Sequence, residues 1–264
     1  MKCVQSCFGL GPQDFRKLIA IAAAAVALLA AVLFVERNPS SAAAVPTRFS
    51  GPTSSQPLAL TADDAFLVVS NTDNNTVSFF DLRSNRNRKL AEVPVQGEPN
   101  GVAFLPDGTK AFVANTLSGT VSVIKTNIRN GVISKTLVNI KVGTEPYGLA
   151  LTPNGRKLYV SNSRSDSISI IDTATNTVIK TIANVGAEPR GLAVTNDGDG
   201  DDNDETVYVT QFLSLPIAGK LDGTDDSKEG RVTVLSTATD TIVGVVKINP
   251  LANTGFNATG DAIA

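Results

Sequence analysis

The stretch GTEPYGLALTPNGRKLYVSNSRSDSISIID, residues 143–172, decides the fold of this chain. Apolar and polar residues alternate in segments such as SISIID, and Pro153-Asn154-Gly155 separates the first two apolar runs. An alternation of period two with Gly, Pro and Asn at the breaks is typical of β-strands joined by tight turns. Together with TVIKTI, which follows it, the stretch predicts four strands, at 148–152, 157–161, 167–172 and 177–182.

The same pattern occurs three more times along the chain. GEPNGVAFLPDGTKAFVANTLSGTVSVI begins at Gly97, PLALTADDAFLVVSNTDNNTVSFFD begins at Pro57, and GAEPRGLAV begins at Gly186 and continues after an insertion as TVYVTQ. One position anchors the alignment, with spacings of 44, 47 and 49 residues between Asn71, Asn115, Asn162 and Gln211. Four short strands in a repeating unit of about 40–50 residues predict the blades of a β-propeller.

We therefore expect an all-β chain, a β-propeller of four-stranded antiparallel blades. The blades are expected at about 57–97, 98–145, 146–188 and 189–250, and residues 251–264 resemble the lead-in and first strand of a fifth. A four-bladed propeller is one interpretation. The interpretation that we favour is a truncated propeller whose remaining blades follow Ala264.

The N-terminal part predicts export. Residues 1–17 carry Lys2, Arg16 and Lys17, and residues 18–35 are an unbroken run of 18 apolar residues. A membrane-spanning helix needs roughly 17–25 such residues, whereas a cleaved signal peptide usually has about 7–15. We expect a transmembrane signal anchor, with a signal peptide cut near Ala42–Ala44 and a buried soluble helix as alternatives. Residues 36–56 are predicted to be a flexible linker, and the blades are expected in the periplasm or at the cell surface, tethered to the membrane or secreted after cleavage.

The composition excludes several function classes. The chain has no histidine and no tryptophan, so a Ser-His-Asp triad and histidine-ligated metal or haem cannot form. The net charge of −2 gives no basic surface for nucleic acid. Both cysteines, Cys3 and Cys7, lie before the apolar run and lack the spacing for haem attachment. We expect no haem, no PQQ-type quinone cofactor and no nucleotide.

LYVSN, FVAN, VYVTQ, the G-x-E-P-x-G lead-in and DTATNTVI resemble the YVTN-type β-propeller repeat of exported bacterial and archaeal proteins. The resemblance covers about residues 57–250 and implies the propeller fold, whereas it implies little about activity. The sequence differs from WD40, quinone-cofactor and haem-binding propellers, whose repeats use the histidines or tryptophans that are absent here.

The Glu-Pro lead-ins are the first candidate site. In a propeller, the loops that enter the first strands share one face, here called the top face, with the loops that join the second and third strands. Because the residue after each proline differs, this ring could bind a ligand or partner through Glu98, Glu145, Glu188, Asn100, Tyr147 and Arg190. The alternative interpretation is that Glu-Pro-x-Gly only forms the turn before the strand. Residues 212–230, a long charged insertion, are expected on the same face.

A second candidate site is the acidic insertion NDGDGDDNDE, residues 196–205, between the first and second strands of the last repeat. Alternating Asp and Gly lets a short loop wrap Ca²⁺, which takes six to eight oxygen ligands. The pattern is not an EF-hand, because position 12 is Tyr208 rather than Glu. The candidate calcium ligands are Asp197, Asp199, Asp201, Asn203, Asp204 and Glu205, and a solvated acidic loop is the alternative.

Three functions remain open at this point. The first is a non-enzymatic, membrane-anchored binding or scaffold protein of the cell envelope, with an envelope protein or a glycan as partner and no nucleic acid. The second is a lactonase-type hydrolase with a divalent metal held by carboxylates and amides. The third is an accessory domain of a larger envelope redox or surface-layer protein. We expect the chain not to be an enzyme, because its glutamates recur in every clear repeat instead of forming one asymmetric site.

Overall fold

The structure is a computed structural model that describes residues 57–83, 88–130, 132–221, 223–224 and 226–250. The predicted anchor, the linker and the start of a fifth blade lie outside these residues. Every described strand belongs to one compact unit of the chain. In the described part of the chain, no helix has the length and apolar character needed to cross a membrane.

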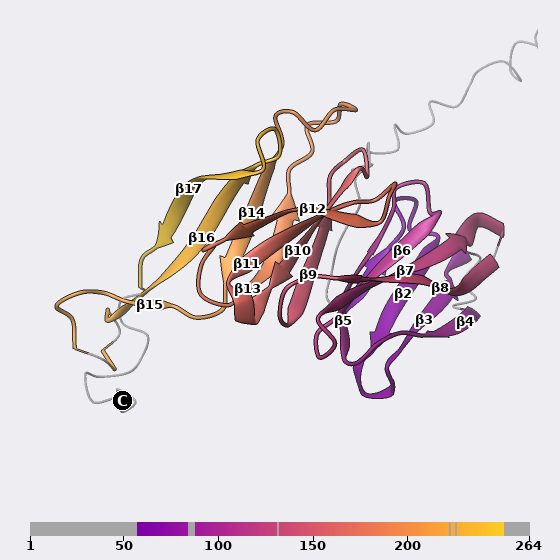
Figure 1. Cartoon of the computed structure of the whole chain (residues 1–264), viewed down its shortest axis with the longest axis horizontal. Helices are drawn as coiled ribbons and strands as arrows, with labels where there is room; N and C mark the ends of the chain where they lie inside the picture. Colours follow the sequence, from indigo (N-terminus) through magenta and orange to yellow (C-terminus); the bar gives the residue numbers. More distant parts are fainter. Residues whose placement is uncertain (1–56, 84–87, 131, 222, 225, 251–264) are drawn as a thin grey trace, which may run out of the picture. The chain divides into compact units, whose positions relative to one another are not determined.

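The described residues form four antiparallel sheets, one for each repeat (Figure 1). Blade 1 contains β1 (Leu58–Leu60), β2 (Phe66–Asn71), β3 (Thr76–Asp81) and β4 (Arg88–Pro94). Blade 2 contains β5 (Pro99–Phe104), β6 (Lys110–Asn115), β7 (Thr120–Asn127) and β8 (Val132–Lys141). Blade 3 contains β9 (Pro146–Leu151), β10 (Lys157–Asn162), β11 (Ser167–Asp172) and β12 (Thr177–Ala183). Blade 4 contains β13 (Pro189–Val194), β14 (Thr206–Gln211), β16 (Lys228–Ser236) and β17 (Thr241–Ile248).

Each blade pairs its strands in chain order. A short additional strand, β15 (Leu215–Pro216), pairs with the start of β16. The loops between the second and third strands of blades 1 and 3 contain the single-turn 3-10 helices η1 (Thr72–Asn74) and η4 (Ser163–Ser165), and η3 (Ile128–Asn130) follows β7. The predicted all-β fold of four-stranded antiparallel blades is confirmed.

First strands lie inside and fourth strands outside. β1, β5, β9 and β13 neighbour one another in succession, and most residues of β9 are buried. By contrast, β12 and β17 are exposed along almost their whole length. This gradient follows from the sequence, because the first and second strands are more continuously apolar than the fourth.

The hydrophobic core lies between successive blades rather than within them. Three clusters of buried side chains join blade 1 to blade 2, blade 2 to blade 3 and blade 3 to blade 4. Phe112 and Tyr159 occupy the same position of β6 and β10, and both are 0% exposed against the next blade. The matching residue of β14, Tyr208, is 40% exposed, because no described blade follows blade 4.

The anchor asparagines close the hairpin between the second and third strands of their own blade. The Asn162 amide donates to the hydroxyls of Ser167 and Ser169 at 3.1 and 3.0 Å. Asn115 makes the same bonds to Thr120 and Ser122, and Asn71 makes them to Thr76 and Ser78. The repeated asparagine therefore has a structural role. Its side chain binds the hydroxyl groups of the residues five and seven positions later, across the tight turn.

The residue after each of the three anchor asparagines binds the next blade. Its side-chain hydroxyl donates to the carbonyl of the proline that begins the following blade, at 2.9, 2.9 and 2.8 Å for Thr72–Pro99, Thr116–Pro146 and Ser163–Pro189. The residue before the anchor adds a second bond of this kind in two blades, from Ser70 to Asn100 and from Ser161 to Arg190. We call these inter-blade bonds the hydroxyl latch.

The opposite end of the second strand carries another inter-blade contact. Lys110, the first residue of β6, donates to the Thr173 carbonyl and the Asn176 side chain in the turn between β11 and β12. Lys157 does the same to blade 4, where it donates to the Thr237 carbonyl at 2.7 Å and pairs with Asp240 at 2.8 Å. Blades 2 and 3 are thus each bound to the next blade at both ends of their second strand.

We predict that Asn162→Ala lowers the free energy of unfolding by about 1–3 kcal/mol, because it leaves buried hydroxyl groups with fewer partners. Denaturant unfolding of the full chain measures this change. The matched control is Asn74→Ala, which removes an exposed asparagine and should cost less than about 0.5 kcal/mol. Equal effects of the two substitutions would contradict the structural role assigned to Asn162.

Candidate functional site

The Glu-Pro lead-ins form the same backbone turn in blades 2, 3 and 4. Glu98, Glu145 and Glu188 have φ angles of 54°, 51° and 48°. Residues other than glycine rarely adopt this left-handed backbone conformation. Their carbonyls accept backbone N–H groups from Thr116, Ser163 and Phe212, each from the loop that follows the second strand. The recurring glutamates therefore occupy a structural turn, whatever their carboxylates do.

Blade 4 departs from this repeat at the residue after its proline. The guanidinium carbon of Arg190 lies 3.5 Å from the ring centroid of Phe212 and 5.0 Å from that of Tyr147. Arg190 also pairs with Glu188 at 3.5 Å, and its Nε is buried without a hydrogen-bond partner. A guanidinium group held against two aromatic rings in this way is pre-positioned for an anion or another acceptor.

A second arginine completes the cluster. Arg164, in η4, pairs with Glu188 at 3.1 Å and with Glu145 at 3.8 Å. The Glu188 side chain is 17% exposed, against 45% for Glu145. The loops of blades 3 and 4 thus place two arginines, two aromatic rings and a shielded carboxylate together, and we call these residues the mouth cluster: Glu145, Tyr147, Arg164, Glu188, Arg190 and Phe212.

The structure places the predicted top-face residues in two groups. Glu145, Tyr147, Glu188 and Arg190 belong to the mouth cluster, whereas Glu98 and Asn100 do not contribute contacts to it. The backbone N–H of Glu98 is bound by the Asn75 side chain, and the Asn100 carbonyl accepts the Ser70 hydroxyl. Sequence reasoning missed Arg164, although it is the one basic residue in the Ser-rich loop that follows β10.

The mouth cluster does not suit a divalent metal. Glu188 is already paired with two arginines, and the side-chain oxygen of Asn162 accepts the backbone N–H of Gly143. Among the residues that the structure describes, the one group of carboxylates close enough to share an ion lies elsewhere, at Asp197, Asp199 and Asp204. The metal-dependent version of the hydrolase hypothesis is therefore not supported by the donors at the mouth.

The acidic insertion connects β13 to β14, at the end of β13 opposite to the mouth cluster. Of the six predicted calcium ligands, Asp197, Asp199 and Asp204 bring their carboxylates together at the exposed tip of the loop. Asp201 is not in this group, although its carboxylate accepts the backbone N–H of Asn203 at 2.7 Å just as Asp197 and Asp199 accept the N–H groups two residues later. Glu205 lies at the foot of the loop and is 3% exposed, with its pKa raised by burial.

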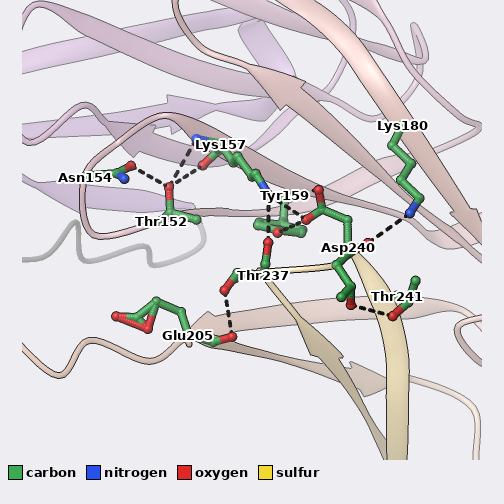
Figure 2. A network of polar contacts seen from close by, with 10 residues as sticks. Thr152, Asn154, Lys157, Tyr159, Lys180, Glu205, Thr237, Asp240 and Thr241 are labelled. Atoms are coloured by element: carbon green, nitrogen blue, oxygen red, sulfur yellow. Dashed lines mark hydrogen bonds and ion pairs between the residues drawn. The ribbon is translucent and has the colours of Figure 1, made fainter. Parts of the chain in front are cut away.

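Figure 2 shows how the foot of this loop is joined to the contact between blades 3 and 4. The Glu205 carbonyl accepts the backbone N–H and the hydroxyl of Thr237, at 3.1 and 2.7 Å. The Thr237 carbonyl in turn accepts Lys157. Tyr159 donates to Asp240 at 2.5 Å, and burial together with this carboxylate raises the pKa of Tyr159.

In the other long insertion, between β14 and β16, the described acidic side chains Asp226 and Glu229 form ion pairs. Lys220 pairs with Asp226, and Glu229 pairs with Arg231 and Lys247. These pairs lower the pKa values of Asp226 and Glu229. Asp222 and Asp225, which also belong to this insertion, lie outside the described residues.

Comparisons with known proteins agree with the fold. The family described as "Lactonase, 7-bladed beta-propeller" matches residues 37–148, less than half of the chain. The chain is similar to hydrazine synthase of Kuenenia stuttgartiensis, with 26% identity and a TM-score of 0.58 over 72% of this chain and 48% of that one. The chain therefore spans about half the length of that relative. No curated protein matches the sequence.

A more distant similarity supports the assignment of the fold and nothing beyond it. A candidate 6-phosphogluconolactonase of Bacteroides uniformis is 17% identical, with a TM-score of 0.54 over 73% of this chain and 55% of that one. Together these findings support a β-propeller family for the chain.

We predict that Tyr159→Phe lowers the free energy of unfolding by about 1–3 kcal/mol, because Asp240 loses a buried hydrogen-bond donor. Tyr208→Phe removes the same hydroxyl at the matching position of blade 4, where the side chain is 40% exposed, and should be nearly neutral. Denaturant midpoints of the full-length variants compare the two. A neutral Tyr159→Phe would mean that this bond does not hold blades 3 and 4 together.

Proposed function

We propose that this chain is a lactonase-type β-propeller hydrolase whose substrate binds at the mouth cluster. The observation that carries the proposal is the break in the repeat at Arg190, which with Arg164 pairs one of the recurring glutamates, Glu188, because an active site needs one asymmetric position on an otherwise repetitive scaffold. The match of residues 37–148 to a lactonase propeller family supports the choice of reaction.

The residues of the mouth cluster have roles that suit ester hydrolysis. Glu188 is a base that can accept a proton from an attacking water molecule. Water oxygen then bonds to the lactone carbonyl carbon, the ring C–O bond breaks, and Glu188 returns the proton that it took from water to the ring oxygen, which leaves as a hydroxyl group. Arg164 and Arg190 stabilise the negative charge that develops on the carbonyl oxygen and then on the carboxylate product.

The proposed substrate class is a small polar lactone such as a sugar lactone. Tyr147 and Phe212 offer flat apolar faces that suit a ring, and the arginines favour acceptor-rich groups around it. The aromatic faces are also already stacked on Arg190, so that the guanidinium group is held in place before a substrate arrives.

The test is whether the purified full chain hydrolyses a panel of sugar lactones. The rate is measured from the acid that is released at constant pH. We expect Glu188→Gln and Arg190→Ala to lower kcat/KM by about 100-fold or more. Glu92→Gln makes the same change as Glu188→Gln on the outer strand β4 and should leave the rate unchanged. Absence of hydrolysis by the unmodified chain, or a full rate with Glu188→Gln, would overturn the proposal.

A second candidate function is an exported binding or accessory propeller of YVTN type, membrane-anchored through residues 18–35 and presenting its top face to an envelope protein or a glycan. It is favoured by the structural use of the other repeated residues, since Glu98 forms a turn and the anchor asparagines close hairpins. The similarity to hydrazine synthase supports the accessory version of this candidate. A chain that binds lactones without hydrolysing them, or ignores them, would favour it over the hydrolase.

A further inference from the structure

The connection between β13 and β14 gathers three carboxylates at its tip. One oxygen from each of Asp197, Asp199 and Asp204 lies within 4.8 Å of the other two. An ion whose metal–oxygen distances are about 2.3–2.6 Å can contact all three at this spacing. Acidic residues on exposed loops are common, so this grouping alone does not identify a ligand.

The charge of this group is not compensated by the protein. Within the described chain, no lysine or arginine forms an ion pair with Asp197, Asp199 or Asp204. The negative charge of Asp197 raises the pKa of Asp204, and burial and the charges of Asp199 and Asp201 raise it further. The other insertion of blade 4 differs, because its described carboxylates Asp226 and Glu229 are paired with basic residues.

An independent observation comes from the foot of the loop. Glu205 is 3% exposed, and its Oε1 atom is buried without a hydrogen-bond partner, while Oε2 accepts the Thr195 hydroxyl at 3.3 Å. Burial raises the pKa of this carboxylate, whereas the backbone of Asp197 acts on it and lowers its pKa, so the buried group adjoins the first acidic residue of the tip. A buried carboxylate oxygen without a partner is costly, and a cation is the ligand that satisfies it.

We propose that residues 195–205 form a calcium site. Asp197, Asp199 and Asp204 supply carboxylate oxygens at the tip, and Glu205 closes the site from below. Calcium fits better than Mg²⁺, which demands near-ideal octahedral geometry and uses few carboxylates. It also fits better than Zn²⁺ or Cu²⁺, because the loop offers no nitrogen or sulfur side-chain ligand.

The position of the site gives calcium a structural role. The Glu205 carbonyl binds Thr237, and Thr237 binds Lys157 of blade 3. An ion that fixes Glu205 therefore also fixes the turn that holds blades 3 and 4 together. Calcium binding should consequently stabilise the propeller, and this proposal does not depend on the chemistry at the mouth cluster.

The experiment uses the full chain, freed of metal with EDTA and then titrated with CaCl₂ in a calorimeter. At about 100 times the dissociation constant, we expect calcium to raise the midpoint of thermal unfolding by about 5–10 °C. The double variant Asp197→Asn/Asp199→Asn should bind calcium at least about tenfold more weakly. In EDTA, however, the same variant should unfold at an equal or higher temperature than the unmodified chain, because like-charge repulsion is relieved.

The variant is therefore expected to bind calcium more weakly and yet to be no less stable than the unmodified chain in EDTA. This combination distinguishes the loss of a bound ion from damage to the fold. Glu205→Gln keeps the side chain's size and should also weaken binding about tenfold or more, whereas Asp73→Asn, an exposed carboxylate of η1, should leave it unchanged. No heat of binding and no shift in midpoint up to about 10 mM calcium would overturn the proposal. Unchanged affinity in both loop variants would overturn it too. Neither readout involves lactone hydrolysis, so failure of one proposal leaves the other standing.

Discussion

The structure depends on one repeated hydrogen bond, from the hydroxyl after each anchor residue to the proline carbonyl at the start of the next blade. A four-stranded blade cannot cover its own two faces, so its stability comes from its neighbours. The hydroxyl latch sets where the neighbour's first strand begins. The three clusters of buried side chains lie between the blades that the latch joins.

The two ends of β13 lie beside clusters of charged side chains that differ in how their charge is balanced. At its start, Glu188 is shielded from water and paired with Arg164 and Arg190. Beyond its end, Asp197, Asp199 and Asp204 gather without a basic partner in the described chain, above the buried Glu205. In the first arrangement the carboxylate is paired, and the Nε atom of Arg190 is left without a hydrogen-bond partner. The second leaves negative charge and a buried acceptor atom uncompensated, so the two ends of the strand favour ligands of opposite charge.

The all-β fold and its four-stranded antiparallel sheets could be predicted from the sequence, because alternation and turn residues are local signals. The acidic loop could be located for the same reason. The stacking of Arg190 between Tyr147 and Phe212 could not, since it joins residues from two blades. Nor could the burial of Glu205, which looks in the sequence like the last residue of a solvated run, or the short strand β15, which is specified by its pairing with β16.

The latch also has a direction. Blade 1 donates to blade 2, blade 2 to blade 3 and blade 3 to blade 4, and the lysine contacts of β6 and β10 run the same way. Each blade thus presents hydrogen-bond donors to the segment that is synthesised after it. It also presents an apolar surface around residues such as Phe112 and Tyr159 to the same segment. A chain that emerges from its N-terminal end can therefore assemble vectorially, with every finished blade serving as the template for its successor.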